Sequence, residues 1–155
     1  MIFDPTSLAT LGGALALIGG LVGSSIGIAK AASAGTATLA EERGQFRNVI
    51  VLSSLPMTQS FYGLIILILI LTAVVPKVEA GGSGMAVLAI GLIGFMAELV
   101  SAIYQGIVCA SGISLLPKTK GQIFTSTMML AVFVELLGVL GLVFSIMALT
   151  MLGLM

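Results

Sequence analysis

The sequence lacks several residue types on which common protein sites depend. It has no histidine and no tryptophan, and its 155 residues include a single cysteine, Cys109. One cysteine cannot build a disulfide framework, and without histidine no Cys/His zinc site can form. Cys109 lies in an apolar run, so we expect it to be a small packing residue.

Charged residues are also scarce. They make up 8% of the chain, with six basic and six acidic residues and a net charge of zero. A soluble domain carries roughly 25% charged residues and needs them for its surface. The shortage of basic residues excludes a nucleic-acid partner and a polybasic lipid-binding patch. With 59% hydrophobic residues and a mean hydropathy of +1.26, the composition indicates a protein embedded in membrane lipid.

Four apolar runs are long enough to cross a bilayer, since about 20 apolar residues in a helix span ~30 Å of hydrocarbon. They are residues 8–33, 48–74, 85–116 and 123–152. We predict helices, because in lipid a helix pairs its own backbone polar groups. The first run has no basic segment before it, so we expect a retained helix rather than a signal peptide. The predicted fold class is an all-α membrane protein with four transmembrane helices.

Segments with the composition of loops separate these runs, at residues 36–47, 76–84 and 117–122. Most basic residues lie in or beside the first and third of these loops. The positive-inside rule therefore predicts that loops 36–47 and 117–122 are cytoplasmic and that both termini lie outside. The protein is then a multi-pass protein of the cell membrane.

The two halves of the chain resemble each other. Gly-Leu-Ile at 63–65 answers Gly-Leu-Val at 141–143, which indicates a duplicated hairpin. The two predicted transmembrane hairpin repeats are residues 1–78 and residues 79–155. At this offset Glu135 falls opposite Met57, so only the second repeat has a carboxylate at that position.

The first run is rich in small residues. Gly19, Gly23 and Gly27 form a stripe with a spacing of four, which lets helix backbones approach closely. Packing within one chain explains such a stripe. Small residues also lie on other faces of this run, and this favours a tight inner ring of helices from many copies of the chain.

Glu135 is the most informative residue of the sequence. It lies near the middle of the last apolar run, with no basic residue within two turns. An ionised carboxylate there costs ~2.5–3.5 kcal/mol even on the insertion scale, so it must be protonated, solvated or bound to an ion. A neutral acid bonded to a neighbouring helix is the structural alternative, but acids inside membranes are usually functional.

A second polar group lies in the second run. Leu55, Thr58, Gln59 and Tyr62 have the spacing of one helix face. Pro56 has no N–H and disturbs the helix, so backbone carbonyls near Leu55 become available to a ligand.

Gln105 in the third run adds another amide. Together with Thr58, Gln59, Glu135 and the backbone carbonyl of Leu55, it provides a set of oxygen ligands for a hard cation. One carboxylate balances one positive charge, which favours a monovalent ion, Na⁺, over Ca²⁺ or Mg²⁺. H⁺ is the alternative, but a proton needs only Glu135 and at most one acceptor.

At these residues the sequence resembles the c subunit, also called K subunit or proteolipid, of prokaryotic V-type and A/V-type rotary ATPases. The motifs are Leu-Pro-x-Thr-Gln-x-x-Tyr-Gly at 55–63, Gln-Gly at 105–106, and Glu135 followed by Gly138 and Gly141. The first motif is similar to that of the sodium-transporting members. The resemblance implies that the tyrosine hydroxyl of Tyr62 locks Glu135.

The resemblance also implies the partners. They are further copies of the chain in a homo-oligomeric ring, a stator subunit of the a/I type with an essential arginine, and the subunits of a central stalk that couples the ring to ATP hydrolysis or synthesis. The chain itself contains no Gly-x-x-x-x-Gly-Lys-Ser/Thr motif, so we expect it to bind no nucleotide and to have no catalytic activity of its own.

Glu98 does not belong to this motif pattern. It precedes Gln105 by seven residues, which places it about 10 Å away along the helix axis on nearly the same face. It is either a protonated, hydrogen-bonded acid, a wall of the ion's exit path, or part of a second site. The first interpretation is favoured narrowly over the second.

Two rival functions use similar features. A small four-helix cation or drug antiporter also carries a single membrane acid, but it needs an aromatic-lined cavity, and this chain has no tryptophan and two tyrosines. A purely structural, channel-forming proteolipid would leave Thr58, Gln59 and Gln105 without a purpose.

Overall fold

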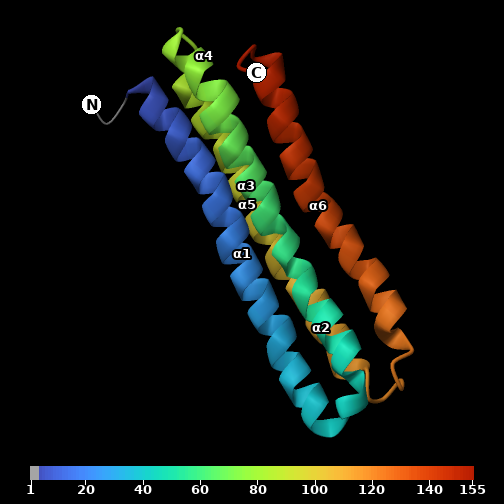
Figure 1. Cartoon of the computed structure of the whole chain (residues 1–155). Coiled ribbons are helices and arrows are strands. Elements are labelled where there is room, and N and C mark those ends of the chain that lie inside the picture. Colours follow the sequence, from blue (N-terminus) through green and yellow to red (C-terminus); the bar gives the residue numbers. More distant parts are fainter. Residues whose placement is uncertain (1–3) are drawn as a thin grey trace.

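The computed structural model describes residues 4–155, and long helices account for nearly all of them (Figure 1). In chain order they are α1 (Pro5–Glu41), α2 (Phe46–Ser54), α3 (Thr58–Leu69), α4 (Val75–Glu79), α5 (Gly84–Leu115) and α6 (Ile123–Met151). Together, α2, α3 and α4 form one continuous helical segment, so four segments are long and apolar enough to cross a membrane. This confirms the predicted all-α fold with four membrane-length helices.

The first two connections are shorter than predicted. Residues 36–41 remain in α1, because alanine, leucine and glutamate favour a helix and no glycine or proline interrupts them. Only Glu42 and a 3₁₀ turn, Arg43–Gln45, then lead into α2. Pro76 does not end the second segment: it is the second residue of α4, which directly follows the π-helical turn Ile70–Val74. The third connection, 117–122, is a loop as predicted.

The second membrane segment changes its helical geometry at two places. Pro56 has no N–H to offer the carbonyl four residues earlier, and the backbone tightens into a 3₁₀ turn at Leu55–Met57. The predicted disturbance of the helix at Pro56 is confirmed. A π-helical turn, Ile70–Val74, widens the same segment before Pro76.

Helix α1 packs against α5 on one face and against the second segment on another. On the first face, a Cβ atom added at Gly106 of α5 would lie 2.3 Å from the Cα of Gly27. On the second, a Cβ atom added at Gly20 would lie 2.4 Å from the backbone oxygen of Gln59. Packing within one chain therefore uses both small faces, and these faces do not by themselves indicate a ring.

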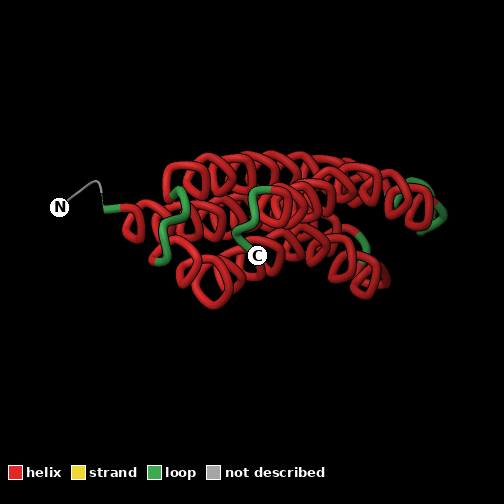
Figure 2. The backbone as a smooth tube through the Cα atoms, turned by 90° about the horizontal axis from the view of Figure 1, so that it is seen from above, coloured by secondary structure: helices red, strands yellow, loops and turns green. Residues whose placement is uncertain are grey.

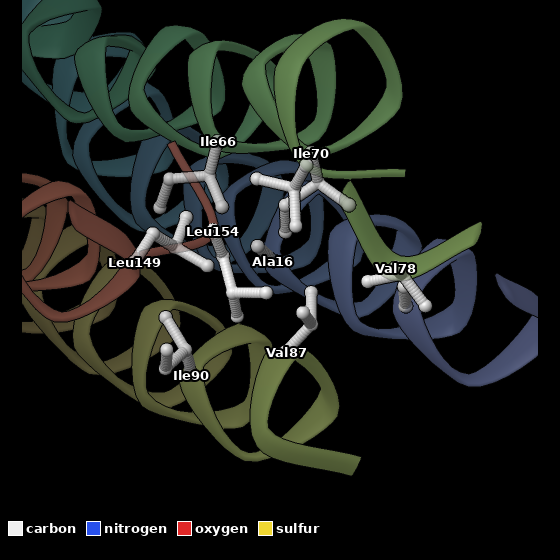
Figure 3. Close-up of a cluster of buried hydrophobic side chains, with 10 residues drawn as sticks. Ala16, Ile66, Ile70, Val78, Val87, Ile90, Leu149 and Leu154 are labelled. Carbon is white, nitrogen blue, oxygen red and sulfur yellow. The ribbon is translucent and has the colours of Figure 1, made fainter. Parts of the chain in front are cut away.

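Two apolar clusters fill opposite ends of the bundle. The first, near the chain ends, contains Ile66, Ile70, Ile90 and Leu149, shown with their neighbours in Figure 3. The second, near the 3₁₀ turn and the 117–122 loop, contains Cys109, which is fully buried among Leu52, Ile113 and Leu116. The prediction that Cys109 is a packing residue is confirmed.

Buried polar side chains occupy the layer between the two clusters. Gln59, Glu98 and Gln105 are each 0% exposed. Figure 2, which looks down on the bundle from above, shows the helices packed side by side along their length. Polar groups on α3, α5 and α6 therefore meet inside the bundle, away from both of its ends.

The close approach of α1 and α5 gives a stability prediction. A Cβ atom added at Gly91 would lie 2.2 Å from the backbone oxygen of Gly12, and backbone cannot move aside cheaply. We expect Gly91→Ala to destabilise the protein by about 1–3 kcal/mol, measured as a lower thermal unfolding midpoint in detergent. The matched control is Gly44→Ala, whose Cβ atom would have Glu42 Oε1 at 3.9 Å as its nearest neighbour. An equal loss in both variants would contradict the packing.

Candidate functional site

Glu135 lies on α6 and is half-buried. Its carboxylate receives one hydrogen bond at each oxygen: the Tyr62 hydroxyl donates to Oε1 at 3.1 Å, and the Gln105 amide donates to Oε2 at 3.2 Å. Helices α3, α5 and α6 contain no lysine or arginine. The carboxylate is therefore held by neutral donors from two helices, with no positive charge from the helices that surround it.

The two glutamines extend this arrangement across the bundle. Gln59 Nε2 donates to Gln105 Oε1 at 3.0 Å, which joins α3 to α5. Both side chains are fully buried, so these amides have no water to replace the bond. A change at either glutamine would leave a buried polar group without its partner.

Three oxygen atoms converge at the 3₁₀ turn. The Thr58 hydroxyl lies 3.2 Å from the Leu55 carbonyl oxygen and 3.2 Å from Gln59 Oε1, and it has one proton to share between them. The Leu55 carbonyl also accepts the Thr58 backbone N–H. Three oxygens this close together suit a cation, because oxygen is the ligand that hard cations prefer.

All six residues predicted for the ion site belong to one network. It leads from the Leu55 carbonyl through Thr58, Gln59 and Gln105 to Glu135, and from Glu135 to Tyr62. The structure thus brings together residues separated by up to 80 positions in the chain. Their role as ion ligands remains a prediction.

Ser101 belongs to the network but was not among the residues predicted from the sequence. Its hydroxyl accepts a hydrogen bond from Gln59 Nε2 at 3.0 Å and donates to the backbone oxygen of Val134 at 2.8 Å. Ser101 precedes Gln105 by four residues, so the two share a helix face. That spacing was the signal available in the sequence.

Glu98 lies outside the network. Its side chain is 0% exposed, and neither carboxyl oxygen has a hydrogen-bond partner among the residues that the structure describes. The hydrogen bond expected for this acid is therefore wrong for the described residues, because α6 presents Gly138 and Gly141 to its oxygens in place of polar side chains. Its protonation stays a prediction.

The chain is similar to known proteins along most of its length. The family model for the C subunit of ATP synthase matches residues 11–70 and 88–148. A curated relative, the K subunit of the A-type ATP synthase of Methanocaldococcus jannaschii, is 36% identical over 147 residues. The match covers 94% of this chain and 63% of that relative, so the chain spans less than two thirds of the relative's length.

The bond between Tyr62 and Glu135 gives a prediction about reactivity. Tyr62→Phe removes the donor to Oε1, a contribution of about 1 kcal/mol, so Glu135 should be held less tightly. We expect a hydrophobic carbodiimide to label Glu135 about fivefold faster, measured by mass spectrometry of the peptide that contains it. Tyr104→Phe is the control, since Tyr104 is 58% exposed on α5. Equal rates in wild type and Tyr62→Phe would show that the bond does not restrain Glu135.

Proposed function

The chain belongs to the family of ATP synthase C subunits, and on that basis we propose that it is a membrane rotor-ring subunit of a V-type or A/V-type rotary ATPase. In this proposal each copy of the chain binds one monovalent cation on Glu135, with Na⁺ favoured over H⁺. The observation that carries the proposal is the continuous network from the Leu55 carbonyl to the Glu135 carboxylate, because it joins one negative charge to a group of oxygens inside a membrane-length bundle.

The oxygens of the network favour sodium over a proton. A proton on Glu135 needs no more than one acceptor, whereas Leu55, Thr58 and Gln59 supply three converging oxygens. Gln105 now turns its nitrogen to Glu135 and its oxygen to Gln59. A cation shared with the carboxylate requires the Gln105 oxygen on that side, and rotating the amide to place it there gives up the bond from Gln59 Nε2. One carboxylate and one monovalent ion leave the site neutral.

The position of Glu135 fits a carrier that alternates between lipid and a partner protein. It is half-buried, and its neighbours Phe133 and Leu137 are 65% and 59% exposed. Neutralised by its cation, the side chain can face lipid. The bare carboxylate is stable only beside water or a positive group, which we assign to an arginine of a stator protein. Rotation of an empty site past lipid is therefore blocked.

Energy coupling follows from the charge count. A membrane potential contributes about 2.3 kcal/mol per charge per 100 mV, so several ions must pass for each ATP. One carboxylate per four helices gives few ions per ring. This favours the pumping of ions at the expense of ATP over the synthesis of ATP. ATP hydrolysis or synthesis belongs to partner proteins, linked to the ring through a central stalk.

The orientation of the chain in the membrane completes the proposal. The connection between α1 and α2, which contains the 3₁₀ turn Arg43–Gln45, lies at the same end of the bundle as the 117–122 loop, opposite the chain end marked C in Figure 1. Basic residues gather at this end, so we place it in the cytoplasm of a prokaryotic cell and the opposite end outside the cell membrane.

Carbodiimide labelling with and without Na⁺ tests the choice of cation. At fixed neutral or alkaline pH, we expect Na⁺ to slow the labelling of Glu135, because the reagent reacts with a protonated carboxyl group and a bound ion replaces that proton. Thr58→Ala removes one oxygen ligand and should raise the Na⁺ concentration for half protection about tenfold. Glu135→Gln is the control for the labelled position. An absence of protection by Na⁺ would replace sodium with the proton as the carried ion.

Native mass spectrometry in mild detergent tests the ring. The proposal predicts one closed assembly with a mass that is a large multiple of the 15.8 kDa chain. Its extensive apolar outer surface, including Phe133 and Phe144 on α6, suits contact with lipid and with further copies. A stable monomer or dimer would contradict the rotor and favour the antiporter class.

A further inference from the structure

Glu98 is a buried acid that the proposed ion cycle does not use. Its side chain is 0% exposed, and both carboxyl oxygens lack a hydrogen-bond partner within residues 4–155. Of the helices packed against α5, α3 and α6 contain no basic residue, and the one lysine of α1, Lys30, is exposed and lies beside Ile107 and Ala110. A charge enclosed in this way has no compensation, so the group is held as a neutral acid.

The carboxyl group of Glu98 lies where α6 has no side chains. A Cβ atom added at Gly138 would lie 2.9 Å from Glu98 Oε2, and one added at Gly141 would lie 3.4 Å from Oε1. At Gly141 the added atom would also come within 2.3 Å of the Ala97 Cβ atom. The carboxyl group therefore fills the space between α5 and α6 that the two glycines leave open.

Three residues on successive turns of α5 contact α6, and Glu98 is the first of them in the chain. Gln105 donates to Glu135 at 3.2 Å, and Ser101 donates to the Val134 backbone oxygen at 2.8 Å. The third contact, between Glu98 and Gly138, lies one turn before Ser101 on α5 and is a packing contact without a hydrogen bond. The three α5 residues share one helix face.

The rotation of α6 about its own axis depends on such contacts. It is the least buried of the four membrane-length segments: 22% of an 18-residue apolar stretch of α6 is buried in the chain, against 28–44% in the other three segments. Gly138 follows Glu135 by three residues, so the two positions lie on adjacent turns of the same face. A rotation of α6 that changes the fit at Gly138 therefore also moves the Glu135 carboxylate.

We propose that Glu98 is a positioning residue, whose neutral carboxyl group packs against Gly138 and Gly141 and fixes the rotation of α6. The Glu135 carboxylate is thereby kept within reach of Tyr62 and Gln105. This inference rests on the proposed function in one respect, the use of Glu135 as the cation carrier. Glu98 itself carries no cation: it is enclosed by the chain, and glycines of α6 instead of oxygen ligands face its carboxyl group.

A double-mutant cycle tests the packing. Glu98→Ala leaves a void beside Gly138. Gly138→Ala places a methyl group 2.9 Å from the Glu98 carboxyl oxygen, and also 3.1 Å from Ser101 Oγ and 3.2 Å from Gln59 Cγ. We expect each single variant to speed carbodiimide labelling of Glu135 about three- to tenfold. In the double variant the new methyl group occupies part of the space of the lost carboxyl group, so its rate should fall well below the product of the two single effects. If the labelling rate of the double variant rises by the product of the two single increases, the proposal is overturned.

Glu98→Gln separates shape from charge. It keeps the size of the side chain and remains neutral, so we expect the wild-type labelling rate of Glu135 and the wild-type pH profile of that labelling. A shifted pH profile, or a change in the number of ²²Na⁺ ions bound per chain, would show that Glu98 carries charge and would overturn the proposal.

The two proposals fail in different ways. Labelling of Glu135 without Na⁺ reports the position of α6, whichever cation the protein carries. If Na⁺ does not protect the wild type, sodium is rejected as the carried ion, but the role of Glu98 is not. Assembly of each variant is checked by native mass spectrometry. Where Glu98→Ala does not assemble, Glu98→Asp, which shortens the side chain and withdraws the carboxyl group from Gly138, must still label faster than wild type, and Glu98→Gln must not.

Discussion

A carboxylate inside hydrocarbon is stable only when donors or a cation surround it, and the arrangement of this bundle serves that requirement at Glu135. Its two oxygens receive hydrogen bonds from α3 and α5, through Tyr62 and Gln105. These helices come close enough because α1 offers both of them glycine in place of side chains, for instance at Gly20 and Gly27. The packing of α1, which contributes no residue to the site, therefore brings α3 and α5 together.

Pro56 makes the other end of the network. Pro56 offers no N–H to the carbonyl four residues earlier, and the helix tightens here into a 3₁₀ turn. In this turn the Leu55 carbonyl accepts both the Thr58 backbone N–H and the Thr58 hydroxyl. The apolar clusters on either side of this layer hold the segment in place.

The two acids in the middle of the bundle differ in environment and therefore in chemistry. Glu135 is half-buried, hydrogen-bonded at both oxygens and flanked by side chains that face outward. Glu98 is enclosed, without a hydrogen-bond partner among the described residues, and lies against glycine. Exchange with an outside partner suits the first. The second suits a fixed neutral group, and its burial keeps the charge balance of the proposed ion site at one carboxylate.

The sequence by itself determined the fold class, the four membrane-length helices, the break at Pro56 and the six residues of the network, because lipid permits few backbone solutions and because polar residues are rare enough to stand out in an apolar chain. It misjudged the ends of the first two loops, where helix-forming residues extend past the apolar runs. Only the tertiary structure decided that the small faces of α1 are used within one chain, that Ser101 links Gln59 to α6, and that Glu98 meets glycine instead of a hydrogen-bond donor. These depend on which residues of separate helices come into contact, and the spacing of residues along one helix does not contain that information.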